Sequence, residues 1–214
     1  MYKYIFFDLD GTLTDPGEGI TNSVAHALTR FGITPPPTEE LYKFIGPPLK
    51  DSFARYYGMS DGECTLAVKY YREYYADKGI FENKVYDGIE ELLAGIQKRG
   101  KKIVLATSKP DLFAEKILEH FGLVKYFDFV AGAAMDETRT KKDEVIAYAL
   151  DRLGMRGEEK DVLMVGDRKH DVLGAAVHGI DSLGVTYGYG SDRELIEAGA
   201  SYLASAPYEI LNFI

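Results

Sequence analysis

The sequence predicts an α/β protein, with a parallel sheet between two layers of helices and an inserted segment that is entirely helical. Two observations carry this prediction. Short apolar runs alternate with longer segments in which apolar residues recur at three- and four-residue spacing, the pattern of strands that alternate with helices. One interval between two of the strands is much longer than the others, and its pattern is helical throughout.

The strands of the sheet are expected at five apolar runs. Amphipathic segments that end in glycine, a common stop signal for a helix, lie between them. Such alternation gives a Rossmann-like core of three layers, in which ligands bind outside the carboxyl ends of the strands. The predicted strands are residues 2–7 (YKYIFF), 101–107 (KKIVLAT), 127–132 (FDFVAG), 161–166 (DVLMVG) and 181–186 (DSLGVT).

The long interval runs from Gly11 to Lys101, about 90 residues, whereas a whole βαβ unit takes only ~30. Asp15 followed by Pro16 fits a helix start, with aspartate as the cap and proline at the first helical position. Ser60 with Glu63 three residues later fits a capping box. We therefore expect residues 1–14 and 86–214 to form the α/β core, and residues 15–85 to form an inserted helical domain.

Composition and charge narrow the class of protein. The chain has 214 residues, 46% of them hydrophobic, and a net charge of -9, which disfavours a nucleic-acid surface because such a surface needs a basic stripe. No apolar run approaches the ~20 residues of a membrane span, and the first residues do not resemble a signal peptide. A single cysteine excludes an intramolecular disulfide. We expect a cytoplasmic protein that needs no partner chain, nucleic acid or membrane.

Four polar motifs follow the carboxyl ends of predicted strands or open the next helix. Parallel strands place these ends along one edge of the sheet, so the motifs are expected to converge. Asp171 lies four residues after Asp167, so a helix that began near Asp167 would put both carboxylates on one face. The motifs are Asp8-Leu9-Asp10-Gly11, Thr107-Ser108-Lys109, Lys141-Lys142 and Asp167 with Asp171.

Asp8 and Asp10, one residue apart at the end of an apolar strand, repel each other unless a cation compensates their charge. With Asp167 and Asp171 the same edge would carry up to four carboxylates. A divalent cation makes such a cluster tolerable, and ligation by oxygen alone suits Mg²⁺. The four aspartates are therefore predicted metal ligands, and Mg²⁺ the predicted cofactor.

The same residues predict phosphoryl-transfer chemistry. Thr107, Ser108 and Lys142 supply hydroxyls and a cation for a phosphoryl group. Asp8 can attack phosphorus and form an aspartyl-phosphate. Asp10 can protonate the departing oxygen and later deprotonate the attacking water. Lys109 and His170, in contrast, fit a surface charge and an exposed or capping residue.

These motifs, in this order, resemble those of the haloacid dehalogenase superfamily. DLDGTLTD followed by a helical insert is similar to the family's first motif and its type-1 cap domain, and ATSK and GDRKHD are similar to later motifs. VYDGIEELL and GVTYGYGS resemble the phosphoglycolate phosphatase-like branch. The resemblance implies that Asp8 is the nucleophile, that Asp10 also binds metal through its backbone carbonyl, and that Asp167 is a metal ligand. Two departures are that Ser108 stands where this branch commonly has asparagine, and that the lysine pair lacks flanking prolines.

The predicted function is a Mg²⁺-dependent phosphatase that acts on a small phosphorylated metabolite, with the helical domain as a lid. Four alternatives remain from the sequence. A 5′-nucleotidase, a pyrophosphatase or a sugar phosphomutase would use the same residues, and a non-catalytic metabolite-binding module would share the fold. Lys141 also remains an alternative to Lys142 as the phosphate lysine.

Overall fold

The computed structural model describes residues 2–136 and 138–214. The chain divides into two compact units. One contains Val85–Ile214 together with the segment that ends at Asp15, and it carries the main sheet. The other, Pro16–Lys84, is the helical insert between the first and second strands of that sheet.

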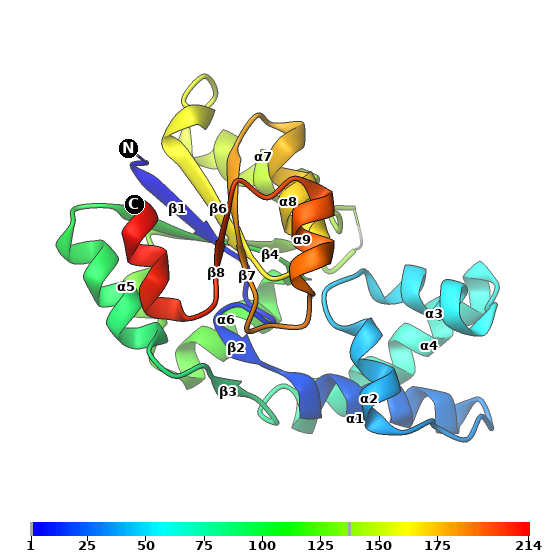
Figure 1. Cartoon of the computed structure of the whole chain (residues 1–214). Helices are drawn as coiled ribbons and strands as arrows, with labels where there is room; N and C mark the ends of the chain where they lie inside the picture. The colour runs from blue at the N-terminus through cyan, green and yellow to red at the C-terminus, as the bar shows by residue number, and fades with distance from the viewer. Residues whose placement is uncertain (1, 137) are drawn as a thin grey trace. The chain divides into compact units, whose positions relative to one another are not determined.

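A six-stranded sheet forms the centre of the larger unit, and its strands are all parallel, as predicted. Their order across the sheet is β5-β4-β1-β6-β7-β8 (Figure 1). The edge strand β8 did not figure in the sequence prediction. The strands are β1 Tyr4–Phe7, β4 Lys102–Pro110, β5 Phe129–Ala133, β6 Val162–Gly166, β7 Asp181–Val185 and β8 Tyr202–Ala204.

The central strands are apolar at consecutive positions because the sheet is covered on both faces. Phe6 pairs in register with Val104 of β4 and Met164 of β6, and all three side chains are buried in one core cluster with Val145 of the helix that follows β5. Neighbouring residues in a strand point to opposite faces, so Phe7 contributes to the other core layer. This rigid centre fixes the positions of the strand ends that carry the polar motifs.

Helices flank the sheet on both sides, with α5 and α6 on one side and α7 and α8 on the other (Figure 1). This gives the predicted three-layer α/β architecture. The helix α9 packs against α8, and a 3₁₀ helix at the end of the chain packs against α5. The helices of this unit are α5 Ile89–Lys98, α6 Asp111–His120, α7 Lys142–Leu153, α8 Lys169–Val177 and α9 Asp192–Ala198.

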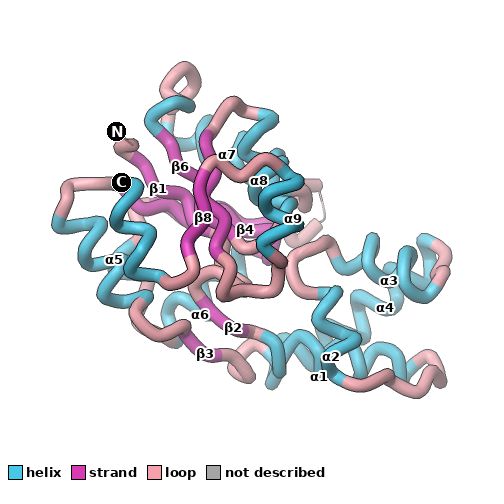
Figure 2. Tube along the Cα trace, in the orientation of Figure 1, coloured by secondary structure: helices cyan, strands magenta, loops and turns pink. Residues whose placement is uncertain are grey.

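The insert is helical, as Figure 2 shows, and a short two-stranded ladder of β2 (Thr14–Asp15) and β3 (Lys84–Val85) joins its two ends. Its first helix and its π-helical turn lie so close together that a Cβ on Gly19 would be 1.9 Å from the carbonyl oxygen of Gly79. The insert contains α1 Gly17–Arg30, α2 Thr38–Leu41, α3 Leu49–Tyr57, α4 Asp61–Tyr74 and the π-helical turn Tyr75–Gly79.

One predicted helix cap is confirmed and one is wrong. Ser60 donates its backbone N–H to Glu63 over 2.8 Å at the start of α4, as the capping box requires. At α1 the N-cap is Pro16 rather than Asp15. The Asp15 carboxylate instead accepts a hydrogen bond from the Tyr189 hydroxyl, a partner that is distant in the sequence.

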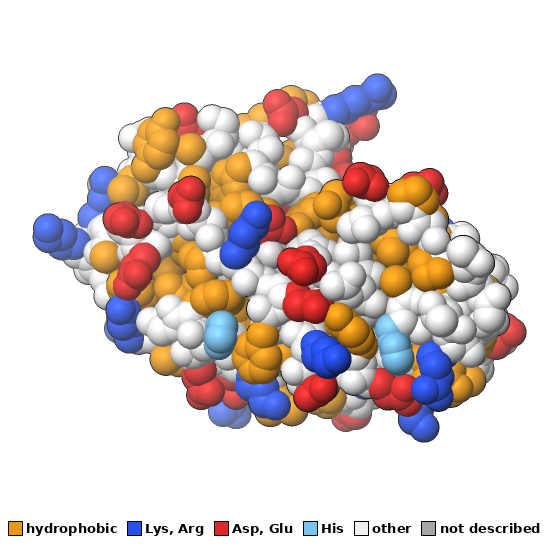
Figure 3. All heavy atoms as spheres, turned by 90° about the horizontal axis from the view of Figure 1, so that it is seen from below, with side chains coloured by type: hydrophobic (Ala, Val, Ile, Leu, Met, Phe, Trp, Pro, Cys, Tyr) orange, Lys and Arg blue, Asp and Glu red, His pale blue; other side chains and the backbone are white. Residues whose placement is uncertain are grey.

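The described residues contain no helix long and apolar enough to cross a membrane. Among the described residues that Figure 3 shows, acidic and basic side chains are interspersed and no continuous basic stripe runs across this face.

Candidate active site at the carboxyl edge of the sheet

The strand order brings the polar motifs together. The strands β4, β1 and β6 are neighbours, so Thr107, Asp8 and Asp167 lie at one edge of the sheet. The strand β4 is longer than predicted and continues to Pro110, so Thr107, Ser108 and Lys109 are among its last residues and do not follow it. The pairing of β4 with β5 is irregular between Ala106 and Pro110, so these three residues lie at a register shift near the end of the strand.

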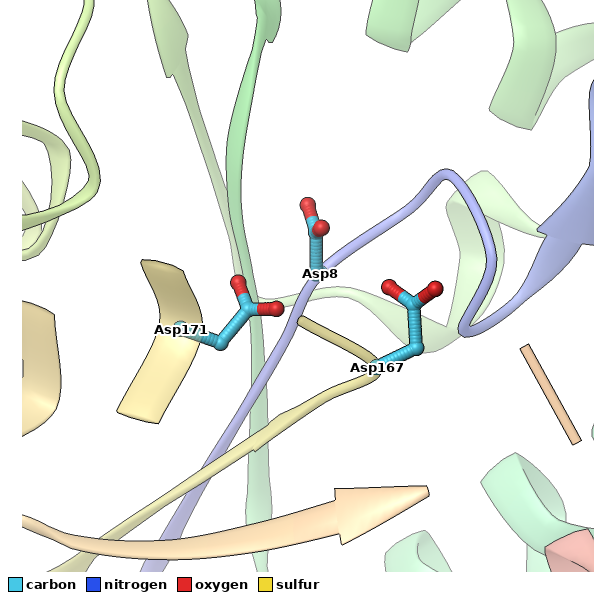
Figure 4. Close-up of side chains that lie close together, drawn as sticks. All are labelled: Asp8, Asp167 and Asp171. Carbon is cyan, nitrogen blue, oxygen red and sulfur yellow. The ribbon is translucent and has the colours of Figure 1, made fainter. Parts of the chain in front are cut away.

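Three carboxylates form a buried group at this edge. Asp8, Asp167 and Asp171 each offer an oxygen that lies within 4.8 Å of the others (Figure 4). The helix α8 begins at Lys169, with Arg168 as its N-cap, so Asp167 precedes the helix and does not share a helical face with Asp171 as predicted. The two carboxylates converge because Asp167 ends the strand and Asp171 lies in the first turn of the helix.

The environment of this group disfavours its negative charge. Burial raises the pKa of Asp167 well above its usual range, and the nearby Asp171 and Asp8 carboxylates raise it further. Burial also raises the pKa of Asp171 to about 6, against the opposing effect of Lys142. Asp167 accepts a hydrogen bond from the Tyr189 N–H at Oδ2, over 2.7 Å, but its buried Oδ1 has no hydrogen-bond partner.

This donor set fits a hard divalent cation. All three ligand atoms are carboxylate oxygens, and the unpartnered Asp167 Oδ1 is a buried acceptor that a cation would satisfy. A bound cation would also offset the repulsion that raises the two pKa values. The group is therefore the kind of metal site that sequence analysis predicted, although the Asp10 carboxylate does not belong to it.

Lys142 lies inside the site and Lys141 does not. The Lys142 ammonium is 2.8 Å from Asp8 Oδ1, from Asp171 Oδ1 and from the carbonyl oxygen of Ala106. Burial lowers the pKa of Lys142, but Asp171 and Asp8 outweigh this effect and raise it. Lys141 is exposed at the N-cap of α7. These three acceptors fix the position of the ammonium, which can attract a negatively charged phosphoryl oxygen.

Asp10 pairs with Lys109, a residue that sequence analysis read as a surface charge. Lys109 is buried, and its ammonium lies 2.7 Å from Asp10 Oδ2. Burial raises the pKa of Asp10, and Lys109 partly opposes the rise. No local pattern could have revealed this residue, because the pairing of β4 is irregular between Ala106 and Pro110 and Asp10 lies far from Lys109 in the sequence.

Thr107 and Ser108 differ in their surroundings. Thr107 is buried, and its hydroxyl accepts a hydrogen bond from the Lys109 N–H over 3.2 Å, which leaves its own proton available to an anion. Ser108 is half-buried. His170 is half-buried as well, and burial lowers its pKa.

The loop Tyr187–Gly190 completes the site, and sequence analysis assigned no role to it. The Tyr189 N–H binds Asp167, and the Tyr187 hydroxyl donates to the carbonyl oxygen of Thr12 over 2.9 Å. A Cβ on Gly188 would lie 2.3 Å from the carbonyl oxygen of Gly11. The loop thus holds the end of β6, which Asp167 directly follows, against the loop after β1. Because these contacts join residues far apart in the chain, no local pattern predicts them.

The chain is similar in sequence to known proteins. The haloacid dehalogenase-like hydrolase family model matches residues 5–185. A 5′-nucleotidase of Pseudomonas aeruginosa is 48% identical, over 91% of this chain and 87% of its own length. Tyrosine-protein kinase PtkA of Mycobacterium tuberculosis is 41% identical, over 88% of this chain but only 63% of its own length.

A more distant sequence relative and a solved structure are also described as phosphatases. Phosphoglycolate phosphatase 1 of Pseudomonas aeruginosa is 29% identical, over 91% of this chain and 73% of its own length. The crystal structure of a predicted phosphatase from Clostridium acetobutylicum has a TM-score of 0.95 and 47% identity, and the match covers 99% of both chains. With the sheet-edge carboxylates and the buried lysine, these matches show that the chain belongs to the haloacid dehalogenase-like hydrolase family and is a phosphatase within it.

Proposed function

We propose that this phosphatase hydrolyses nucleoside 5′-monophosphates, with Mg²⁺ as its metal and Asp8 as its nucleophile. The identity of 48% to a 5′-nucleotidase, against 29% to a phosphoglycolate phosphatase, supports the substrate class. This order favours the nucleotidase alternative over the phosphoglycolate phosphatase-like activity that sequence analysis placed first.

The observation that supports the chemistry is the position of Asp8. Its carboxylate directly follows β1, lies 2.8 Å from the Lys142 ammonium and belongs to the buried group with Asp167 and Asp171. A nucleophile in this position is next to a cation that attracts a phosphoryl oxygen and next to a set of ligands that binds a metal. The Asp8 side chain is nearly inaccessible to solvent, so few waters compete with the substrate.

Each residue of the site then has a role in two steps. Asp8 attacks phosphorus and becomes an aspartyl-phosphate while Asp10 protonates the departing oxygen. Asp10 then takes a proton from the water that hydrolyses this intermediate. Lys142, Thr107 and Ser108 bind the oxygens of the transferring group and hold it in line.

Asp8, Asp167 and Asp171 would hold Mg²⁺, together with the backbone carbonyl of Asp10. When bound, the ion supplies positive charge that offsets the charge of the transferring oxygens. Asp171 also caps α8, because its Oδ2 accepts the Arg168 N–H over 3.0 Å. This hydrogen bond orients the carboxylate before any ion arrives.

The insert Pro16–Lys84 is proposed to act as the cap domain of the enzyme. The paired strands β2 and β3 form both connections to the larger unit, which suits a lid that moves as one body. A lid that closes over a small substrate would exclude bulk water during phosphoryl transfer.

The test is a phosphate-release screen with Mg²⁺ and with chelator. The panel contains nucleoside 5′-monophosphates, phosphoglycolate, pyrophosphate and a sugar phosphate. We expect metal-dependent release from the nucleotides and none from the folded Asp8→Asn variant. Faster release from phosphoglycolate or pyrophosphate would overturn the substrate class, and an isomerised sugar phosphate without free phosphate would indicate a mutase. Normal turnover by Asp8→Asn would overturn the nucleophile.

A further inference from the structure

The buried ion pair between Lys109 and Asp10 is the feature of the site that the proposed reaction has not yet used. The Lys109 side chain is 5% exposed and that of Asp10 is 12% exposed. A lysine rarely gives up its hydration unless it has a specific partner. Lys109 lies near the end of β4, where the pairing with β5 is irregular, and it directly precedes Pro110.

This pair makes the two oxygens of Asp10 different. The Lys109 ammonium lies 2.7 Å from Oδ2, whereas Oδ1 is buried and has no hydrogen-bond partner. An ammonium can only donate hydrogen bonds, so the oxygen that it contacts is held as an acceptor. The other oxygen is left as the one that can carry a proton toward a substrate.

We propose that Lys109 is a positioning residue that holds Asp10 Oδ2 and so presents Oδ1 as the oxygen that exchanges the proton in both steps of the reaction. The proposal rests on the proposed function, because it requires Asp10 to act as the general acid and base. It goes further in naming the oxygen that acts and the residue that selects it.

One proton leaves Asp10 in the first step and returns to it in the second. In the first, the bond between Asp8 and phosphorus forms, the bond from phosphorus to the ester oxygen breaks, and that oxygen takes the proton from Asp10 Oδ1. In the second, water adds to phosphorus, its proton returns to Asp10 Oδ1, and the bond to Asp8 breaks. Inorganic phosphate leaves, and Asp10 is protonated again. Lys109 keeps its own protons throughout.

The leaving group provides a sharp test, because p-nitrophenolate departs without a proton whereas a ribose 5′-oxygen needs one. General acid catalysis contributes roughly 10²- to 10⁴-fold, and misplacing the acid forfeits part of that. In Lys109→Met we expect kcat/KM for a nucleoside 5′-monophosphate to fall about 10- to 100-fold. For p-nitrophenyl phosphate we expect kcat/KM within about threefold of wild type, because this constant reports only the steps up to the first irreversible bond cleavage.

The second step gives an independent readout. It uses the same proton acceptor whichever ester was cleaved, so a misplaced Asp10 slows the breakdown of the aspartyl-phosphate. Rapid mixing of Lys109→Met with p-nitrophenyl phosphate should therefore show a burst of about one equivalent of p-nitrophenol per active site, followed by slow turnover. If the substitution only unfolded part of the enzyme, the amount of active enzyme would fall and no burst of one equivalent of p-nitrophenol would be seen.

Two further variants complete the design. Lys109→Arg keeps a cationic donor and should restore most of kcat/KM for the nucleotide, and it remains informative if Lys109→Met does not fold. Lys116→Met, at an exposed position of α6, should behave as wild type with both esters. Circular dichroism of each variant verifies the fold.

The proposal is overturned if both esters lose kcat/KM equally, if KM alone rises, or if neither ester is affected. An equal loss would indicate a structural role, and a rise in KM alone would indicate that Lys109 contacts the substrate. Failure of the proposed function would look different, because the wild-type enzyme would then not hydrolyse nucleotides. The comparison would still proceed with β-glycerophosphate as the poor leaving group.

Discussion

The loop Tyr187–Gly190 positions Asp167 so closely that one added methyl group should disable the site. A Cβ on Gly190 would lie 1.9 Å from the carbonyl oxygen of Asp167, whereas ordinary contacts begin at 3.4 Å. In Gly190→Ala the loop and the strand end must therefore separate by about 1.5 Å. Both partners are backbone or buried, so no flexible side chain can absorb the movement.

The size of the effect follows from this displacement. Metal ligands tolerate deviations of only about 0.2 Å, and a misplacement of ~1 Å can cost about 100-fold in rate. We expect kcat/KM of Gly190→Ala to fall at least about 100-fold and the apparent affinity for Mg²⁺ to weaken. Overpacking should also lower the free energy of unfolding by about 1–3 kcal/mol.

The assay is phosphate release as a function of Mg²⁺ concentration, with a denaturant titration of the same samples. Gly62→Ala is the matched control, since a Cβ at this position of α4 meets no atom within 4 Å. That variant should keep full activity and gain up to about 1 kcal/mol in stability, because alanine is favoured over glycine in a helix. Wild-type metal affinity and activity in Gly190→Ala would show that the close approach of Gly190 to Asp167 does not position the site.

Three other predictions concern charge and capping. Lys142→Met should lower the unfolding free energy by about 3–5 kcal/mol and abolish turnover, because it leaves the buried Asp8 and Asp171 carboxylates without their cation. Lys141→Met, at an exposed site, should change neither quantity. Equal effects of the two variants on the denaturation midpoint and on activity would contradict this prediction. In metal-free protein the pKa of Asp171 is about 6, above its value of ~3.9 in the unfolded chain, so the folded state holds this proton more tightly. Stability should therefore rise by about 1 kcal/mol as the pH falls from about 7 to about 5, and the full gain of about 3 kcal/mol should be reached only below pH ~4. The titration of His170 opposes this effect, and it is common to wild type and Asp171→Asn. Parallel curves of unfolding temperature against pH for the two proteins would exclude a contribution of Asp171. Ser60→Ala keeps the backbone hydrogen bond to Glu63 but loses the Ser60 hydroxyl, which donates to the Glu63 carboxylate over 2.6 Å at the start of α4, so the unfolding free energy should fall by about 1 kcal/mol. An unchanged denaturation midpoint would argue against a stabilising role of this hydroxyl.

The sequence was informative where the physical cause is local. The apolar runs that became β1, β4, β6 and β7 are buried on both faces, which forces consecutive apolar residues, and the long helical interval is visible from spacing alone. The edge strand β8 was missed because it has only three residues and its first is exposed. The connecting strands β2 and β3 have two residues each, too few for any periodic signal.

The sequence predicted those parts of the site that depend on residue type and on position at the end of a strand. The structure places Asp8, Asp167 and Asp171 together, and the role of each is still a proposal. Sequence analysis missed the partners that only the fold supplies. Asp15 was expected to cap a helix, but its carboxylate accepts the Tyr189 hydroxyl instead. Lys109 was read as a surface charge because nothing near it in the sequence shows that Asp10 lies beside it.

Phosphoryl transfer to Asp8 is the step that the buried carboxylates are proposed to serve. The most direct measurement is mass spectrometry of peptides from enzyme quenched in acid during turnover, with Mg²⁺ and with chelator. We predict a phosphoryl group on Asp8 in the presence of Mg²⁺ and none when the metal is chelated. A phosphoryl group on another residue, or an unlabelled enzyme that nevertheless turns over, would contradict the account.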